Sequence, residues 1–144
     1  MSPILPVILF LSFGVSLLAQ STQSVVGTWE FVSATTVRSD GTKVEYTTDD
    51  LRSTKILNQT HFCVITRNAD GSHRHTNEGP FVVEGDLYTE TLEYATNPSW
   101  IGSDVTYKWR IEGDLWYIDE IGTTAESRGE VWRRVRGARK AVEF

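Results

Sequence analysis

The chain has 144 residues, a formal net charge of −5 and a single cysteine. Its length suits one domain with one hydrophobic core. The negative net charge argues against a nucleic-acid partner, and one cysteine excludes an intramolecular disulfide, so the core alone must hold the fold. Cys63 lies in an apolar run, Phe62–Ile65, and is expected to be a small buried hydrophobe.

The first nineteen residues carry no charge and contain a long apolar run. Small and polar residues follow at once in Ala19–Ser24. This pattern predicts a signal peptide over residues 1–19, and therefore a secreted or periplasmic protein that leaves the membrane after cleavage. An uncleaved membrane anchor is the alternative, because no Lys or Arg precedes the apolar run and Leu17 is large for its place near the cleavage site.

After this leader, apolar and polar side chains alternate with the period of two that is typical of strands. Adjacent Gly and Asp residues, as at Gly85 and Gly113, predict hairpin turns between successive strands. The polar segment 72–78 is expected to be a loop or an exposed strand. The predicted strands are 26–37, 43–47, 54–58, 61–67, 79–84, 87–94, 105–111, 115–120 and 130–135.

About nine strands at a spacing of roughly ten residues, with no helix of about ten or more residues, predict an all-β fold. We expect an antiparallel up-and-down barrel of about 8–10 strands over residues 25–136, followed by a basic C-terminal tail over residues 137–144.

The first and last strands carry the residues expected to close this barrel. Gly27 and Trp29 open the first strand, and Trp132 precedes two arginines in the last. The two strands must pair if the barrel is to close, and a cation over an indole face is worth about 0.5–2 kcal/mol. We expect this pairing to bring Arg133 or Arg134 beside Trp29. Arg134 is favoured because it shares a strand face with Trp132.

A first strand opening with Gly-x-Trp and a last strand ending in arginine resembles the lipocalin and fatty-acid-binding (calycin) barrels. The chain also carries further motifs in order: Gly27–Glu30, Lys55–Leu57, Thr60–Phe62, Tyr88–Tyr94, Trp109–Tyr117 and Glu130–Trp132. With these motifs, residues 25–136 resemble a bacterial family of small secreted lipocalin-like domains of unknown function. The resemblance implies export and a calycin-like barrel in which Trp29 plugs one end, and it gives no catalytic residues. Neither the helical lid of fatty-acid-binding proteins nor the C-terminal helix of lipocalins is expected here.

Glu90 is the candidate polar group of the barrel interior. In the strand 87–94 its face also carries Tyr88, Leu92 and Tyr94, and we expect this more aromatic face to point inwards. A buried lone carboxylate needs a partner or takes up a proton. The alternatives are a structural ion pair, or a strand of opposite phase with Glu90 in solvent. Candidate partners are His61, Arg67, Tyr107, Tyr117 and Arg134. The predicted ligand-binding set is His61, Tyr88, Glu90, Tyr107, Trp109 and Tyr117.

Five tryptophans and five tyrosines favour an aromatic pocket for an apolar or amphipathic small molecule. One alternative is an acid–base enzyme that uses Glu90 with His61 or a tyrosine. The other is a solid barrel that works through its surface as an interaction or accessory domain. No nucleophile elbow, phosphate loop or haem-attachment motif is present, so the sequence favours binding over catalysis and predicts no cofactor. His73 and His75 have metal-ligand spacing, but two histidines beside a turn do not predict a metal site.

Overall fold

A computed structural model describes residues 24–121 and 127–137. The predicted signal peptide and residues 138–144 of the predicted tail lie outside this range. The described residues form a strand-rich chain with one short 3-10 turn. Its elements are β1 (Gly27–Val37), β2 (Lys43–Thr47), β3 (Leu51–Leu57), β4 (His61–Asn68), β5 (His73–Glu84), β6 (Leu87–Thr91), β7 (Tyr94–Ala95), η1 (Pro98–Trp100), β8 (Asp104–Glu112), β9 (Leu115–Glu120) and β10 (Ser127–Arg134).

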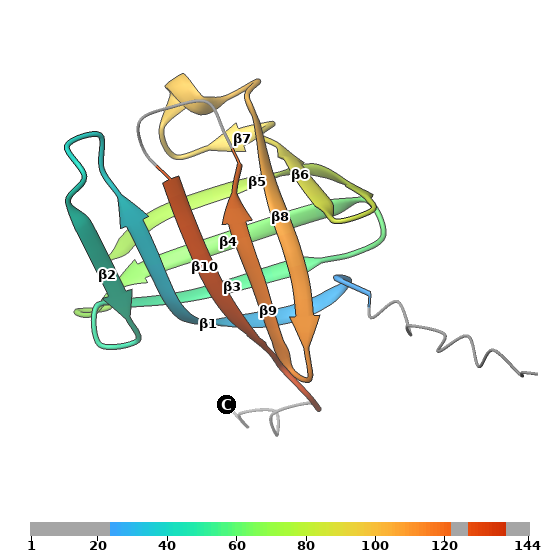
Figure 1. The fold of residues 1–144 in the computed structure, drawn as a ribbon, viewed down its shortest axis with the longest axis horizontal. Coiled ribbons are helices and arrows are strands. Elements are labelled where there is room, and N and C mark those ends of the chain that lie inside the picture. The colour runs from blue at the N-terminus through green and yellow to red at the C-terminus, as the bar shows by residue number, and fades with distance from the viewer. Residues whose placement is uncertain (1–23, 122–126, 138–144) are drawn as a thin grey trace, which may run out of the picture.

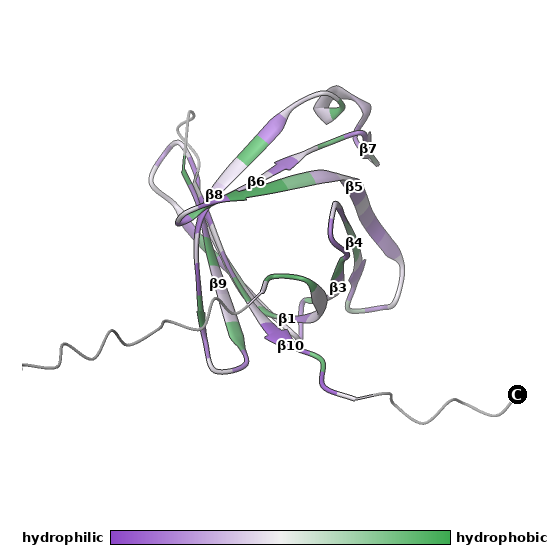
Figure 2. Cartoon of the chain, turned by 90° about the vertical axis from the view of Figure 1, so that its right-hand side faces the viewer, coloured by the Kyte–Doolittle hydropathy of each residue, from purple (hydrophilic) through white to green (hydrophobic). Residues whose placement is uncertain are grey.

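Eight of the described strands form a closed antiparallel barrel (Figure 1). Their order is β10, β9, β8, β6, β5, β4, β3, β1, and β1 pairs with β10 to complete the ring. Figure 2, turned by 90° from Figure 1, shows this ring. The short strands β2 and β7 pair with β1 and β5 beside this ring. The predicted all-β antiparallel barrel is confirmed, and so is the pairing of its first and last strands.

Strand β1 pairs with three neighbours because it is long and changes direction. Its first part, Gly27–Glu30, pairs with β3, and its second part, Ser33–Val37, pairs with β2. Strand β10 pairs along the other edge, with an irregularity between Phe31 and Ser33. The chain therefore passes from one end of the barrel to the other within a single strand.

The polar segment 72–78, expected to be a loop or an exposed strand, forms the first half of β5. It pairs with β4, where His75 is opposite the buried Thr66 and Asn77 is opposite the buried Val64. Residues opposite each other share a face of the sheet, so His75 and Asn77 face inwards. The segment lacks an apolar face because its inward side chains line a cavity and not a packed core.

The predicted strand 87–94 is shorter in the structure, because β6 ends at Thr91. The chain crosses β5 closely here: Glu93 N–H donates to the carbonyl of Glu78 at 3.0 Å, and a Cβ on Gly79 would lie 1.9 Å from the Thr91 carbonyl oxygen. This bend ends the alternation. Tyr94, predicted to face inwards, is consequently 53% exposed.

A packed core fills one end of the barrel. The ring centroid of Trp116 lies 5.1 Å from that of Trp29 and 5.2 Å from that of Tyr88. These three side chains and that of Ile118 are fully buried, and Phe62 is nearly so. Buried aromatic side chains dominate core energetics, so this packing is a major source of apolar stabilisation.

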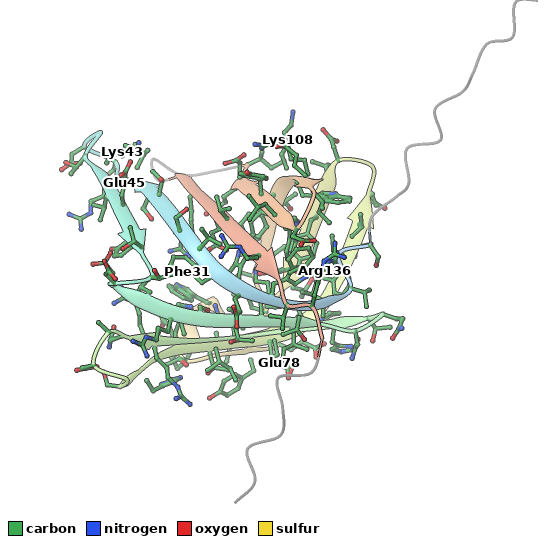
Figure 3. All side chains as sticks on the ribbon, turned by 90° about the horizontal axis from the view of Figure 1, so that it is seen from below. Phe31, Lys43, Glu45, Glu78, Lys108 and Arg136 are labelled. Atoms are coloured by element: carbon green, nitrogen blue, oxygen red, sulfur yellow. The ribbon has the colours of Figure 1, made fainter. Side chains whose placement is uncertain are left out.

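The outer wall carries charged side chains that point away from the barrel. Lys43 and Glu45 of β2 form an exposed ion pair of 2.7 Å, and Figure 3 shows them at the edge of the molecule. Cys63 lies on the outward face of β4 and is half-buried, where burial and the nearby Glu78 raise the pKa of its thiol. It is less buried than expected. Within the described residues no helix is long and apolar enough to cross a bilayer.

Candidate ligand-binding cavity

Residues of the first and last strands close one end of the barrel. Trp29 is fully buried, and its indole Nε1 donates a hydrogen bond to the carbonyl of Val25 at 2.8 Å. The guanidinium of Arg134 lies 4.1 Å from the Trp29 ring centroid and donates to two backbone carbonyls just before β1, at 2.6 and 3.0 Å. A Cβ on Gly27 would come within 2.9 Å of this guanidinium. Arg133, the other arginine considered, is exposed.

The opposite half of the barrel is hollow. It contains a cavity of about 270 Å³ and an adjoining one of about 240 Å³. The apolar part of the larger cavity wall includes Phe31, Ala34, Val64 and Trp132. The residues that line both cavities are Thr36, Asn77, Glu90, Tyr107 and Arg128.

Lys55 of β3 lies at the floor of the larger cavity and is 2% exposed. Its Nζ is 2.8 Å from Oε1 of Glu90 and 3.9 Å from Oε2 of Glu130. The same Glu90 oxygen accepts a hydrogen bond from the Tyr88 hydroxyl at 2.7 Å, and Glu130 Oε2 accepts one from the Trp132 indole at 2.9 Å. Buried charges persist when they are paired and hydrogen-bonded. Each carboxylate here has both a cation and a neutral donor.

Aromatic rings surround the ammonium group of Lys55. Burial, followed by the charge of Glu90, raises the pKa of both Tyr88 and Tyr107 well above the usual 10, so the two phenols stay protonated. Rings at this distance attract a cation and hold it in place. The ring centroids 5.0–5.9 Å from Lys55 Nζ belong to Tyr88, Tyr107, Trp116 and Trp132.

A chain of hydrogen bonds runs along one wall of the larger cavity. Ser53 Oγ donates to the carbonyl of Ile65 at 3.1 Å and lies 2.7 Å from Thr66 Oγ1, which lies 3.1 Å from Nε2 of His75. Because the one hydroxyl hydrogen of Ser53 is used, Thr66 donates to Ser53 and His75 Nε2–H donates to Thr66. Burial, followed by the charge of Arg128, lowers the pKa of His75 to about 4. His75 is therefore neutral at pH 7.

Three arginines, which we call the rim arginines, line the larger cavity where it opens to solvent: Arg38, Arg74 and Arg128. The guanidinium of Arg74 lies 5.9 Å from the ring centroid of Tyr46, which also lines the cavity. Arg128 Nη1 lies 3.9 Å from Oε1 of Glu130 and its side chain is 45% exposed. The mouth of the cavity is thus cationic.

Of the predicted ligand-binding residues, Glu90, Tyr88 and Tyr107 lie inside the barrel. Trp109 also packs against the core, but it lines neither cavity, and its Nε1 donates to the carbonyl of Gly85 at 3.2 Å near a hairpin turn. Trp132, predicted to help close the barrel, lies further inside. It lines the larger cavity, with its ring centroid 5.8 Å from that of Phe31.

The predicted places of His61 and Tyr117 in the pocket are wrong, because both face outwards. His61 is exposed, while its neighbour Phe62 is buried. Tyr117 lies on the outside of β9, where the guanidinium of Arg110 covers its ring at 4.0 Å from the centroid. Consequently the Glu90–His61 pair considered for acid–base chemistry does not form. Two arginines were also considered as partners of Glu90. Arg67 is exposed on the surface, and Arg134 lies over Trp29 at the closed end of the barrel.

Lys55, Glu130 and the rim arginines were not predicted as site residues. Lysine is rarely buried, and no local pattern marks Lys55 as an exception. Its one supporting signal is that Leu57, two residues on, shares its strand face and is buried. The acidic partners come from β6 and β10, which only the folded barrel brings to β3.

No group of three or more His, Cys, Asp or Glu side chains in the described part of the chain could hold a metal ion. His73 and His75 belong to the same strand, but His75 is hydrogen-bonded to Thr66 in the cavity wall whereas His73 is exposed and lies 3.0 Å from Thr76 Oγ1.

Comparison with known proteins gives a family and a fold. The model of a family described as a domain of unknown function, DUF4488, matches residues 24–141. No curated protein is similar enough to the chain to match it. A structure of an uncharacterized protein from Bacteroides eggerthii DSM 20697 is 14% identical, with a TM-score of 0.50 over 78% of this chain and 100% of that one. At this identity the likeness shows the fold alone.

Two further structures are similar to the chain at lower TM-scores. A lipocalin-like protein from Bacteroides uniformis ATCC 8492 is 16% identical and has a TM-score of 0.49 over 76% of this chain and 97% of that one. A de novo designed fluorescence-activating β-barrel is also 16% identical, with a TM-score of 0.43 over 76% of this chain and 93% of that one.

Proposed function

The chain belongs to DUF4488, a family of domains of unknown function, and from its cavity we propose that it binds a small amphipathic molecule inside the open half of the barrel. The observation that carries this proposal is the combination of an apolar wall with a fixed, ion-paired floor. Ligand sites are concave, mostly apolar and furnished with a few well-placed polar groups.

The floor of the cavity supports binding because it is organised before any ligand arrives. Lys55 and Glu90 hold each other at 2.8 Å, and the Tyr88 hydroxyl fixes the same carboxylate oxygen. A preorganised site loses less conformational freedom when it binds. Above this floor, Phe31 and Trp132 offer flat apolar surfaces to the non-polar part of a ligand.

The size of the cavity favours a compact ligand. Its two parts measure about 270 and 240 Å³, which places each just below the range of about 300–1,000 Å³ common for ligand sites. A ring system or a short chain suits these volumes better than a long acyl chain. Where the two parts meet, the buried Oδ1 of Asn77 has no hydrogen-bond partner among the described residues. This oxygen is available to an N–H or O–H group of the ligand.

Export of the protein is part of the proposal. The support is the uncharged apolar leader over residues 1–19 with small and polar residues after it. In that case the barrel would meet its ligand outside the cytoplasm. Amino-terminal sequencing of the secreted protein would be expected to begin near Gln20, and recovery of Met1 would contradict export with cleavage.

The binding proposal is tested by titration with N-phenyl-1-naphthylamine, a neutral dye that fluoresces in apolar surroundings. Saturable binding of about one dye per chain is expected, together with a change in the emission of Trp132, which lines the cavity. Native mass spectrometry of the freshly purified protein would show whether a ligand of natural origin is retained.

Two neighbours on β4 provide a matched test of where the dye binds. Val64 is buried and lines the cavity, whereas Ile65 is on the outer face and 40% exposed. Val64→Trp should abolish dye binding by filling the cavity, and Ile65→Trp should leave binding unchanged. Ala34→Leu, a smaller change in the same wall, covers the case in which Val64→Trp does not fold. Equal binding by the cavity variants and Ile65→Trp would place the dye elsewhere and contradict the proposal.

A further inference from the structure

The charges around the larger cavity do not balance. Its lining contains four cationic side chains and two carboxylates, and His75 is neutral at pH 7. The lining therefore carries two more positive than negative charges, although the whole chain has a net charge of −5. Such a local excess of one sign, opposite to that of the molecule, is a feature of sites that attract ligands of the other sign.

The excess lies at the mouth and not at the floor. Lys55 is paired with Glu90 at 2.8 Å, and Glu130 lies 3.9 Å from both Lys55 and Arg128. These two cations and two carboxylates neutralise one another. Arg38 and Arg74 remain, and neither forms an ion pair with a carboxylate of the described residues.

The strands bring these two arginines to the same opening as Arg128. Arg128 is opposite Thr36 across the β1–β10 pair, and Arg38 lies two residues beyond Thr36 on the same side of the chain. Arg74 reaches the opening from β5 and lies over Tyr46. Guanidinium groups present several donors in a plane and match the geometry of a carboxylate or sulfonate.

We propose that the cavity selects an amphipathic organic anion, with its apolar part against the cavity wall and its carboxylate, sulfonate or phosphate group at the rim arginines. This inference rests on the proposed function and adds the charge and the orientation of the ligand. In this orientation the head group lies at the mouth of the cavity and not at Glu90 on the floor, because Lys55 already neutralises Glu90.

The test compares two dyes of nearly the same shape and different charge. 8-Anilinonaphthalene-1-sulfonate carries a sulfonate, and N-phenyl-1-naphthylamine lacks it. The parent protein should bind the anionic dye with a Kd about ten times lower at low ionic strength. This preference should shrink with added salt, because partly exposed charges are screened.

Arg38→Gln and Arg74→Gln should each raise the Kd for the anionic dye by about three- to tenfold, the scale of a partly exposed charge-assisted contact. Binding of the neutral dye should stay within about twofold. Arg38→Lys, which keeps the charge, should restore part of the affinity. Arg110→Gln is the matched control, since Arg110 lies on the outer wall over Tyr117 and lines neither cavity.

The outcomes separate this inference from the function on which it rests. If both dyes bind with the same Kd, and Arg38→Gln and Arg74→Gln do not discriminate between them, the protein binds small molecules but the anion preference is wrong. If Arg110→Gln weakens binding of the anionic dye as much as the rim variants do, the loss reflects the overall charge of the protein and not contacts at the rim, and the proposed anion site is wrong. If neither dye binds in the cavity, the proposed function itself fails.

Discussion

Removing the ammonium group of Lys55 is the sharpest test of how the cavity floor is held. Lys55→Met keeps an unbranched side chain of similar length, so it changes little of the packing among the surrounding rings. What it removes is the cation that lies 2.8 Å from Glu90 and 3.9 Å from Glu130. Glu90 is 4% exposed, so water does not replace the lost partner.

The expected loss follows from the burial of this pair. Breaking a buried ion pair by removing one partner costs about 3–5 kcal/mol, because the other charge stays in the interior. A domain of this size has about 5–15 kcal/mol of stability in total. Glu90→Gln should cost less than Lys55→Met. The carboxamide oxygen can still accept the Tyr88 hydrogen bond, and Lys55 still has Glu130 nearby.

Urea titrations of the parent, Lys55→Met and Glu90→Gln measure these losses directly. With a slope of about 2 kcal/mol per molar urea, Lys55→Met should lower the midpoint by about 2 M. A loss below about 1 kcal/mol, the scale of a surface change, would refute the argument that this ammonium neutralises the floor.

Two further predictions concern the closed end and the cavity wall. Trp29→Ala should lower the free energy of unfolding by about 3–5 kcal/mol, whereas Trp100→Ala, at an exposed position, should lower it by less than about 1 kcal/mol. Similar losses of the two variants in urea titrations would contradict the role of Trp29 as a plug. The pKa of His75 is about 4 in the folded protein, against an ordinary value of 6.5. Between these pH values the unfolded chain binds a proton that the folded protein does not, so the contribution of His75 to stability is complete above about pH 6.5 and is lost as the pH falls towards 4. The parent should therefore lose more stability than His75→Gln between those two pH values, and parallel losses would contradict a buried neutral histidine.

The barrel was predictable because its signals are local. Alternating side chains, and turns at Gly85 and Gly113, both with φ of 62°, mark where strands run and where they reverse. The meeting of Trp29 with the last strand follows from closure, since β1 and β10 are the strands left to pair. The bend after Thr91 was not predictable, because it depends on the contact with Gly79 of another strand.

The inward face of individual strands was harder to predict because aromatic residues occur on both faces. In β9, Trp116 is fully buried and its neighbour Tyr117 faces outwards, where Arg110 covers it. A cation over a ring lets a large aromatic side chain lie on the surface. Side-chain period alone therefore does not tell which of the two adjacent aromatics enters the barrel.

The cavity floor could not be predicted because its charges meet only after folding. Glu90 lies on a face that sequence alternation marks as aromatic, which is why it stands out. Lys55 stands between Thr54 and the outward-facing Ile56 in a strand that resembles an ordinary exposed one. Its burial makes sense only once β6 and β10 bring two carboxylates and their aromatic neighbours to β3.

An eight-stranded barrel is wide enough either to fill with side chains or to hold one small ligand, so its strand count does not decide between a solid and a hollow interior. Here the two solutions occupy opposite ends of one barrel. Trp29 and Trp116 pack one end, whereas polar side chains such as Asn77 and His75 face the cavity at the other. Replacing a buried ion pair by well-packed apolar residues of the same volume is often neutral or stabilising. Filling the barrel therefore does not require the ion pair of Lys55 and Glu90, and its presence at this position supports our proposal that the floor faces a ligand.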